Sequence, residues 1–173
     1  MVNAADRSSM SAGTPGAPRG KWLGLLAFLA VCFAIAGLGG AVTARSVHTW
    51  YPGLSKPSFN PPDWVFAPVW TFLYVTIAIA GWRIWSSGRG APARRALIAY
   101  AVQLALNLAW SFLFFGDHRI GAALLDILTL FVVIGLTAVM FWRINRVAGW
   151  LLAPYTVWVG FASALNFAIW RLN

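Results

Sequence analysis

Charged residues are scarce in this sequence, and acidic ones most of all. Only 10% of the 173 residues are charged and four are Asp or Glu, whereas 60% are hydrophobic and the mean hydropathy is +0.72. An ordinary soluble domain carries about 25% charged residues. The composition therefore excludes a soluble globular domain and indicates a membrane protein.

Residue types that often carry chemistry are also nearly missing. The single cysteine, Cys32, lies inside an apolar run, which excludes an intrachain disulfide and disfavours a thiol-based metal site. The lone histidines His48 and His118 are expected to be solvated and not heme ligands. The sequence has no Ser-His-Asp arrangement, metal-ligand spacing or phosphate loop, so it predicts no metal site, no obligatory cofactor and no certain catalytic residue.

Five long apolar runs are present instead, and each is long enough to cross a bilayer. They lie near residues 22–44, 65–85, 94–115, 120–142 and 147–170, and a span needs about 20 apolar residues. Backbone groups in lipid must bond within their own segment, so we expect an all-α membrane protein, a bundle of five transmembrane helices in residues 22–173. Residues 1–21, rich in Ser, Ala, Gly and Pro, are expected to form a disordered tail.

Basic residues flank the apolar runs and form no patch typical of nucleic-acid binding, so no nucleic-acid partner is expected. Successive runs cross the membrane in opposite directions, which places nine of the basic residues on one side and four on the other. The nine are Arg7, Arg19, Lys21, Arg83, Arg89, Arg94, Arg95, Arg143 and Arg146. Because cytoplasmic segments carry the excess of Lys and Arg, we expect a cytoplasmic N-terminus and an outside C-terminus. A bacterial cell membrane is the expected location.

Polar and aromatic side chains recur at helical spacing in three of the runs. Residues three or four apart share one helix face. The stripes are Gln103, Asn107, Trp110 and Phe114, then Asp126, Thr129, Val133 and Thr137, then Tyr155, Trp158, Ala162 and Asn166. The first run has a small-residue stripe made of Ala30, Ala34, Gly37, Ala41 and Ala44. Polar groups in lipid normally face the bundle interior, so these four stripes predict a cavity.

Several of these polar residues have a second interpretation. Gln103, Asn107 and Asn166 can hydrogen-bond between helices, at about 0.6 kcal/mol each, or contact a ligand in the cavity. Asp126 is the only acid inside a run; an intramembrane carboxylate is a functional candidate, and pairing with Arg119 or a hydroxyl is the structural alternative.

A proline-rich loop precedes the second run. Residues 50–63 contain Pro52, Pro57, Pro61 and Pro62, which restrict the backbone and reduce the entropy lost when the loop is ordered. We therefore expect a preformed lid over an outward-opening pocket, with Trp64 where the lid meets the helix. A rigid aromatic lid suits a flat, apolar ligand.

Four segments carry a family resemblance that covers residues 22–173. "YPGLSKPSFNPPDWVFAPVW", "QLALNLAWSFLFFG", "LLAPYTVW" and "ALNFAIWRLN" resemble motifs of the tryptophan-rich sensory proteins, bacterial relatives of the mitochondrial translocator protein once called the peripheral-type benzodiazepine receptor. The resemblance implies a five-helix bundle, often a homodimer. It also implies binding of porphyrins such as protoporphyrin IX, heme-related tetrapyrroles, sterols or synthetic ligands.

The resemblance assigns ligand-binding roles to individual residues. The family's pocket residues correspond to Trp64, Asn107, Trp110, Trp158 and Ala162. Phe59 stands where the family often has Trp, and Ala122 stands where animal members have Trp. Together with Asp126 and Asn166 from the stripes, these residues except Ala122 form the candidate site.

The function that follows from the candidate site stays open at this point. Light-dependent porphyrin degradation, reported for some bacterial members of the family, would make Trp64 and Trp158 catalytic candidates as electron donors. A transporter and a signalling scaffold are the alternatives, and a sterol is the alternative ligand. Phe167 and Ala168 replace tyrosines of the animal sterol-recognition pattern, which is weak even when intact.

Overall fold

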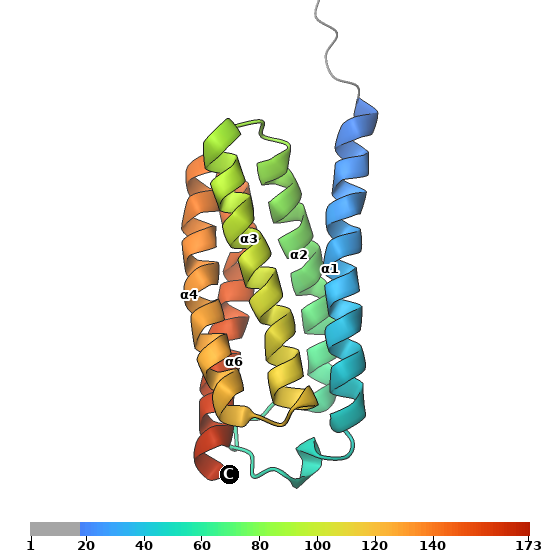
Figure 1. Cartoon of the computed structure of the whole chain (residues 1–173), viewed down its shortest axis with the longest axis vertical. Helices are drawn as coiled ribbons and strands as arrows, with labels where there is room; N and C mark the ends of the chain where they lie inside the picture. The colour runs from blue at the N-terminus through green and yellow to red at the C-terminus, as the bar shows by residue number, and fades with distance from the viewer. Residues whose placement is uncertain (1–17) are drawn as a thin grey trace, which may run out of the picture.

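The computed structural model describes residues 18–173, and this part of the chain is a bundle of long helices (Figure 1). The helices are α1 (Pro18–Ser46), α2 (Phe66–Trp85), α3 (Gly90–Ser111), α4 (Ile120–Ile144), α5 (Arg146–Leu151) and α6 (Ala153–Leu172). Five segments are long and apolar enough to cross a membrane, because α5 and α6 together form one of them. The prediction of a five-helix membrane bundle is confirmed.

Two helix boundaries differ from those expected. Residues 18–21, which we expected in the tail, belong to α1, and the rest of the expected tail lies outside the described residues. The fifth span is interrupted at Leu152, between α5 and α6. Pro154 in the first turn of α6 has no N–H to donate into a continuous helical ladder, which accounts for the break.

The bundle has two distinct ends. At the loop end, the connection between α1 and α2 lies beside the C-terminus; at the N-terminal end, α1 begins and α2 joins α3 (Figure 1). Helix α1 packs on α2 and α3, while α4 packs between α3 and α6. Figure 1 shows α1 at the edge of the bundle, so one side of this helix has no neighbour.

The small-residue stripe of α1 faces away from the other helices, contrary to the prediction. All five members are exposed, namely Ala30, Ala34, Gly37, Ala41 and Ala44, and Ala44 alone among these five lines the cavity described below. The opposite face packs instead: the Phe28 ring lies 6.5 Å from Trp85 and 5.9 Å from Tyr100, and the Cys32 sulfur lies 3.3 Å from the Tyr100 hydroxyl. Large side chains make more van der Waals contacts than alanines, so this face packs and the small one meets the lipid.

Apolar side chains fill the N-terminal half of the bundle. Ile77, Ile84, Phe141 and Leu152 are at most 1% exposed. Gln103 is also 1% exposed, and neither atom of its amide has a hydrogen-bond partner among the described residues. The polar stripe of α3 therefore continues into a packed core at Gln103, and its residues nearer the loop end line open space.

Candidate functional site

A cavity of about 630 Å³ lies in the loop-end half of the bundle. It is lined by α1, α2, α3 with its π-helical extension η3 (Phe112–Gly116), α6 and the first connection; within residues 18–173, α4 contributes nothing to it. Its volume is within the range of small-molecule sites, roughly 300–1,000 Å³. Six residues of the predicted site line it, namely Trp64, Asn107, Trp110, Trp158, Ala162 and Asn166.

Helix α2 supplies an aromatic wall that the sequence analysis missed. Phe66, Trp70 and Tyr74 all line the cavity, and their spacing of four residues puts them on one helix face. The Trp70 ring lies 5.6 Å from Tyr74 and 6.4 Å from Tyr155. That spacing, together with a tyrosine hydroxyl inside an apolar run, is the sequence signal that would have identified this wall.

Asn107 connects three helices at the bottom of the cavity. The Tyr74 hydroxyl on α2 donates to Asn107 Oδ1 at 2.6 Å, and Asn107 Nδ2 donates to the Tyr155 hydroxyl on α6 at 3.2 Å. Asn107 is 4% exposed and Tyr155 is 0% exposed. The amide therefore serves the interhelical bonding that was one of its two interpretations, and a buried polar group gains most from being paired.

Trp110 and Asn166 form a second polar link nearer the loop end. Trp110 Nε1 donates to Asn166 Oδ1 at 3.0 Å, and Asn166 Nδ2 donates to the Ile120 carbonyl at 3.1 Å. The Trp110 ring stacks on Phe114 of η3, with 5.2 Å between centroids and 23° between planes. Both polar links bond within the protein, so the wall they present to the cavity is largely ring surface.

Trp158 and Ala162 lie one turn apart on α6. The Trp158 ring is 5.9 Å from Phe66 and 5.6 Å from Phe161. Its Nε1 atom is buried without a hydrogen-bond partner among the described residues, so this donor is unpaired within the packed wall of the cavity. The methyl side chain of Ala162, a cavity-lining residue, leaves space where a larger side chain would fill the cavity.

Two predicted site residues lie outside the cavity. Phe59 is 50% exposed and its ring packs 6.3 Å from Phe161. Asp126 belongs to α4, which lies on the far side of α3 and α6 from α1. Its Oδ2 atom is buried without a hydrogen-bond partner among the described residues, so this oxygen bonds neither Arg119 nor a hydroxyl.

The first connection crosses the loop end and is fastened to α6. The Ser55 amide donates to Asn173 Oδ1 and Asn173 Nδ2 donates to the Ser55 carbonyl, both at 3.0 Å. Asp63 and Trp64, at the other end of the connection, line the cavity, and Trp64 is 75% exposed. The structure thus orders the proline-rich loop beside the cavity mouth; its action as a lid stays a prediction.

Tyr51 anchors this loop in the cavity wall. It is 4% exposed, its hydroxyl donates to Asn60 Oδ1 at 2.8 Å, and the Lys56 ammonium lies 4.6 Å from its ring centroid. Burial, and secondarily the Asp63 carboxylate, raise the pKa of Tyr51 to about 12, while the bond to Asn60 acts in the opposite direction. The neutral phenol is therefore the form that the observed position of the loop favours.

The two histidines occupy different surroundings. His48 is exposed and lines the cavity mouth. His118 stacks on Trp50, with 4.1 Å between ring centroids, and its Nε2 atom lies 3.1 Å from Ser46 Oγ. Because that hydroxyl donates its proton to the Phe115 carbonyl at 2.6 Å, His118 Nε2–H must be the donor to Ser46. Within residues 18–173, no group of three or more His, Cys, Asp or Glu side chains could hold a metal ion.

Exposed lining residues show where the cavity opens. On α1 they are Phe33, Gly40 and Ala44, and on α2 they are Ala67 and Thr71. These two helices are neighbours at the edge of the bundle (Figure 1). The cavity is therefore accessible along the seam between α1 and α2 as well as at the loop end.

Comparison with known proteins agrees with this architecture. The model of the TspO/MBR family matches residues 28–171. A tryptophan-rich protein TspO from Archaeoglobus fulgidus is 45% identical over 149 residues, covering 86% of this chain and 94% of the relative. The translocator protein of Sus scrofa is 40% identical over 159 residues (88% and 91%), and a tryptophan-rich sensory protein from Cereibacter sphaeroides is 38% identical over 153 residues (88% and 92%). Since the matches extend over nearly all of the described bundle, the chain belongs to the TspO/MBR family.

Proposed function

We propose that this membrane protein binds a flat, apolar tetrapyrrole such as protoporphyrin IX in the cavity. The observation that carries the proposal is the chemistry of the wall: rings from α2, α3 and α6 surround about 630 Å³, and the amides beside them bond to other protein groups. Such a wall offers stacking surface and few free polar atoms, which favours a large conjugated ligand over a polar one.

The lining residues also support the place and the direction of binding. Among the described residues, Asp63 is the one Asp, Glu, Lys or Arg that lines the cavity, and it lies at the mouth. Its negative charge repels the carboxylates of a porphyrin, so these belong beyond the mouth, near Arg45 and Lys56, and the macrocycle belongs inside. We propose that the loop end faces the outside of the cell, in line with the excess of basic residues at the N-terminal end.

Binding is tested by quenching of tryptophan fluorescence on titration of protoporphyrin IX into the protein in lipid nanodiscs. We expect saturable quenching with micromolar affinity, about −8 kcal/mol. Ala162→Phe places a ring in the cavity and should weaken binding at least ten-fold. Ala164→Phe is the matched control, because Ala164 lies on the same helix, is exposed and is not a lining residue.

Equal affinities in the two variants would contradict the proposed site, and absence of saturable quenching would contradict the ligand class. A sterol titrated in competition tests the alternative ligand. Sensing, transport and light-dependent degradation are then separated by two assays on the wild type: porphyrin flux into liposomes, and loss of porphyrin absorbance under illumination. Flux alone would indicate transport, bleaching alone would indicate degradation, and neither would favour sensing.

A further inference from the structure

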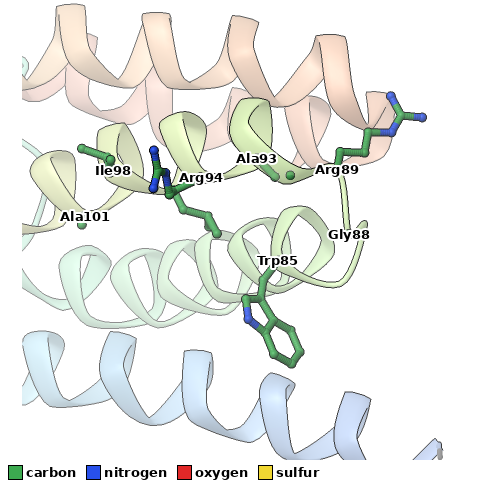
Figure 2. A pocket seen from close by; sticks show the side chains of 9 residues that line it. Trp85, Gly88, Arg89, Ala93, Arg94, Ile98 and Ala101 are labelled. Carbon is green, nitrogen blue, oxygen red and sulfur yellow. The ribbon is translucent and has the colours of Figure 1, made fainter. Parts of the chain in front are cut away.

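A second hollow lies at the opposite end of the bundle from the cavity. It is an open groove of about 430 Å³ that begins at the α2–α3 connection and follows the first turns of α3 (Figure 2). Gly88 and Gly90 have positive φ values of 64° and 49°, and a Cβ atom at either position would meet nothing within 4 Å. The tight connection thus leaves the end of the groove uncovered.

The groove combines positive charge with an apolar wall. Arg89 and Arg94 line it and are exposed, and Figure 2 shows their side chains extending in opposite directions along α3. Leu97, Ile98 and Ala101 continue the groove toward the middle of the helix. Ile98 is 58% exposed, so the apolar part of the wall is open to the surrounding lipid.

Nothing acidic balances these arginines within the described residues. The cations at the N-terminal end include Lys21, Arg83, Arg89, Arg94, Arg95, Arg143 and Arg146, whereas the three described acids, Asp63, Asp117 and Asp126, lie in the loop-end half. Guanidinium groups without a carboxylate nearby favour an anionic partner, and they match the geometry of phosphate oxygens.

Trp85 fixes the interfacial end of the groove. It lines the groove, and its ring packs against α1 so closely that a Cβ atom on Gly24 would collide with it. Figure 2 shows the indole pointing from α2 toward α1. Tryptophan is enriched at the level of lipid headgroups, so the arginines beside Trp85 lie at the depth of phospholipid phosphates.

We propose that this groove binds one anionic phospholipid. Arg89 and Arg94 are exposed, so their side chains, which point apart along α3, can turn toward each other and hold the phosphate of the headgroup between them. One acyl chain lies along Leu97, Ile98 and Ala101. The charge selects the headgroup, because each basic residue near a membrane surface favours anionic lipid. The apolar wall selects a lipid over a free phosphate ion, because burying the chain adds to the binding. The proposal does not depend on what the cavity binds.

The test is native mass spectrometry of the protein released from mixed micelles that contain equimolar phosphatidylglycerol and phosphatidylcholine with identical chains. We expect the wild type to retain one phosphatidylglycerol in preference. Arg89→Gln with Arg94→Gln should lower that preference by roughly five-fold for each arginine removed. The double control Arg143→Gln with Arg146→Gln removes the same charge at the same end, away from the groove, and should keep the preference.

A third variant tests the apolar wall. Ala101→Phe fills the groove and should reduce the lipid retained by about one molecule per protomer with the arginines intact. An equal loss of preference in both arginine double variants would overturn the proposal, since it would show a general charge effect. Full displacement of the retained phosphatidylglycerol by millimolar glycerol 3-phosphate would overturn the proposal in favour of a site for a free anion. A lipid-free dimer as the main species, with Ala101→Phe shifting it to monomer, would overturn it in favour of a second copy in the groove.

Discussion

The two hydrogen bonds of Asn107 should stabilise the bundle measurably. Asn107 joins Tyr74 on α2 to Tyr155 on α6 through bonds of 2.6 and 3.2 Å. Interhelical hydrogen bonds in membranes contribute about 0.6 kcal/mol on average and at most about 1.7 kcal/mol. Asn107→Leu keeps a side chain of similar size and removes both bonds, so the free energy of unfolding should fall by about 1.2 kcal/mol, with about 3.4 kcal/mol as the upper limit.

Burial places the expected loss in the upper part of that range. Tyr155 is 0% exposed and Asn107 is 4% exposed, so the substitution leaves the Tyr155 hydroxyl without a partner, and an unpaired buried group costs about 1–3 kcal/mol. The free energy is measured by reversible unfolding in mixed micelles of increasing dodecyl sulfate content. A double-mutant cycle that combines Asn107→Leu with Tyr74→Phe isolates the shorter bond. The coupling energy between Tyr74 and Asn107 should be at least about 0.6 kcal/mol.

Thr71→Val is the control for this experiment. Thr71 also lines the cavity, but its hydroxyl donates to the Ala67 carbonyl within α2, so its loss removes no link between helices. This variant should stay within about 0.5 kcal/mol of the wild type. A coupling energy near zero between Tyr74 and Asn107, or equal losses in Asn107→Leu and Thr71→Val, would refute the reasoning that the amide serves to connect the helices.

Three further outcomes concern the ligand. Illumination should bleach bound protoporphyrin IX faster than free ligand, and Trp64→Phe or Trp158→Phe should slow that bleaching; equal rates in all three proteins would leave the tryptophans as packing residues. Replacing Pro61 and Pro62 by Ala makes the loop more flexible, and ordering it again on binding should cost roughly 0.4–1 kcal/mol per proline. Porphyrin release measured by stopped flow should therefore become several-fold faster, while the thermal melt stays unchanged. An unchanged release rate would contradict the lid. Burial raises the pKa of Tyr51 from 10.0 to about 12, so Tyr51 loses its proton at lower pH when the loop is open than when it is closed. Rising pH therefore favours the open loop, and porphyrin release should accelerate between pH 10 and 12. Release from Tyr51→Phe should show no such pH dependence.

Helical spacing was a reliable guide to α3 and α6. Asn107, Trp110, Trp158 and Asn166 line the cavity because polar groups inside an apolar helix are costly in lipid and turn inward. The same spacing could not predict which neighbouring helix packs against a given face. Asp126 lies on the partly buried face of α4, but α4 packs between α3 and α6, away from α1, so its stripe does not reach the cavity.

Hydropathy was a poorer guide to α1 and α2. Lipid solvates apolar side chains as well as a protein core does, so a stripe of small residues such as Ala30 and Gly37 is equally suited to either side of a membrane helix. Trp70 was missed because an interfacial tryptophan and a cavity tryptophan look alike in composition. The path of the first connection, which turns Phe59 toward Phe161, depends on tertiary contacts with α6 that no local pattern contains.

A structure of the protein with protoporphyrin IX bound in nanodiscs tests the central claim most directly. The account predicts one macrocycle between α1, α2, α3 and α6, with its faces against the rings of Trp70, Trp110 and Trp158 and its carboxylates beyond the mouth, toward Arg45 and Lys56. Asn107 and Asn166 should keep their bonds to Tyr155 and Trp110. A porphyrin on the lipid-facing surface of the bundle, with the cavity unchanged, would contradict the account.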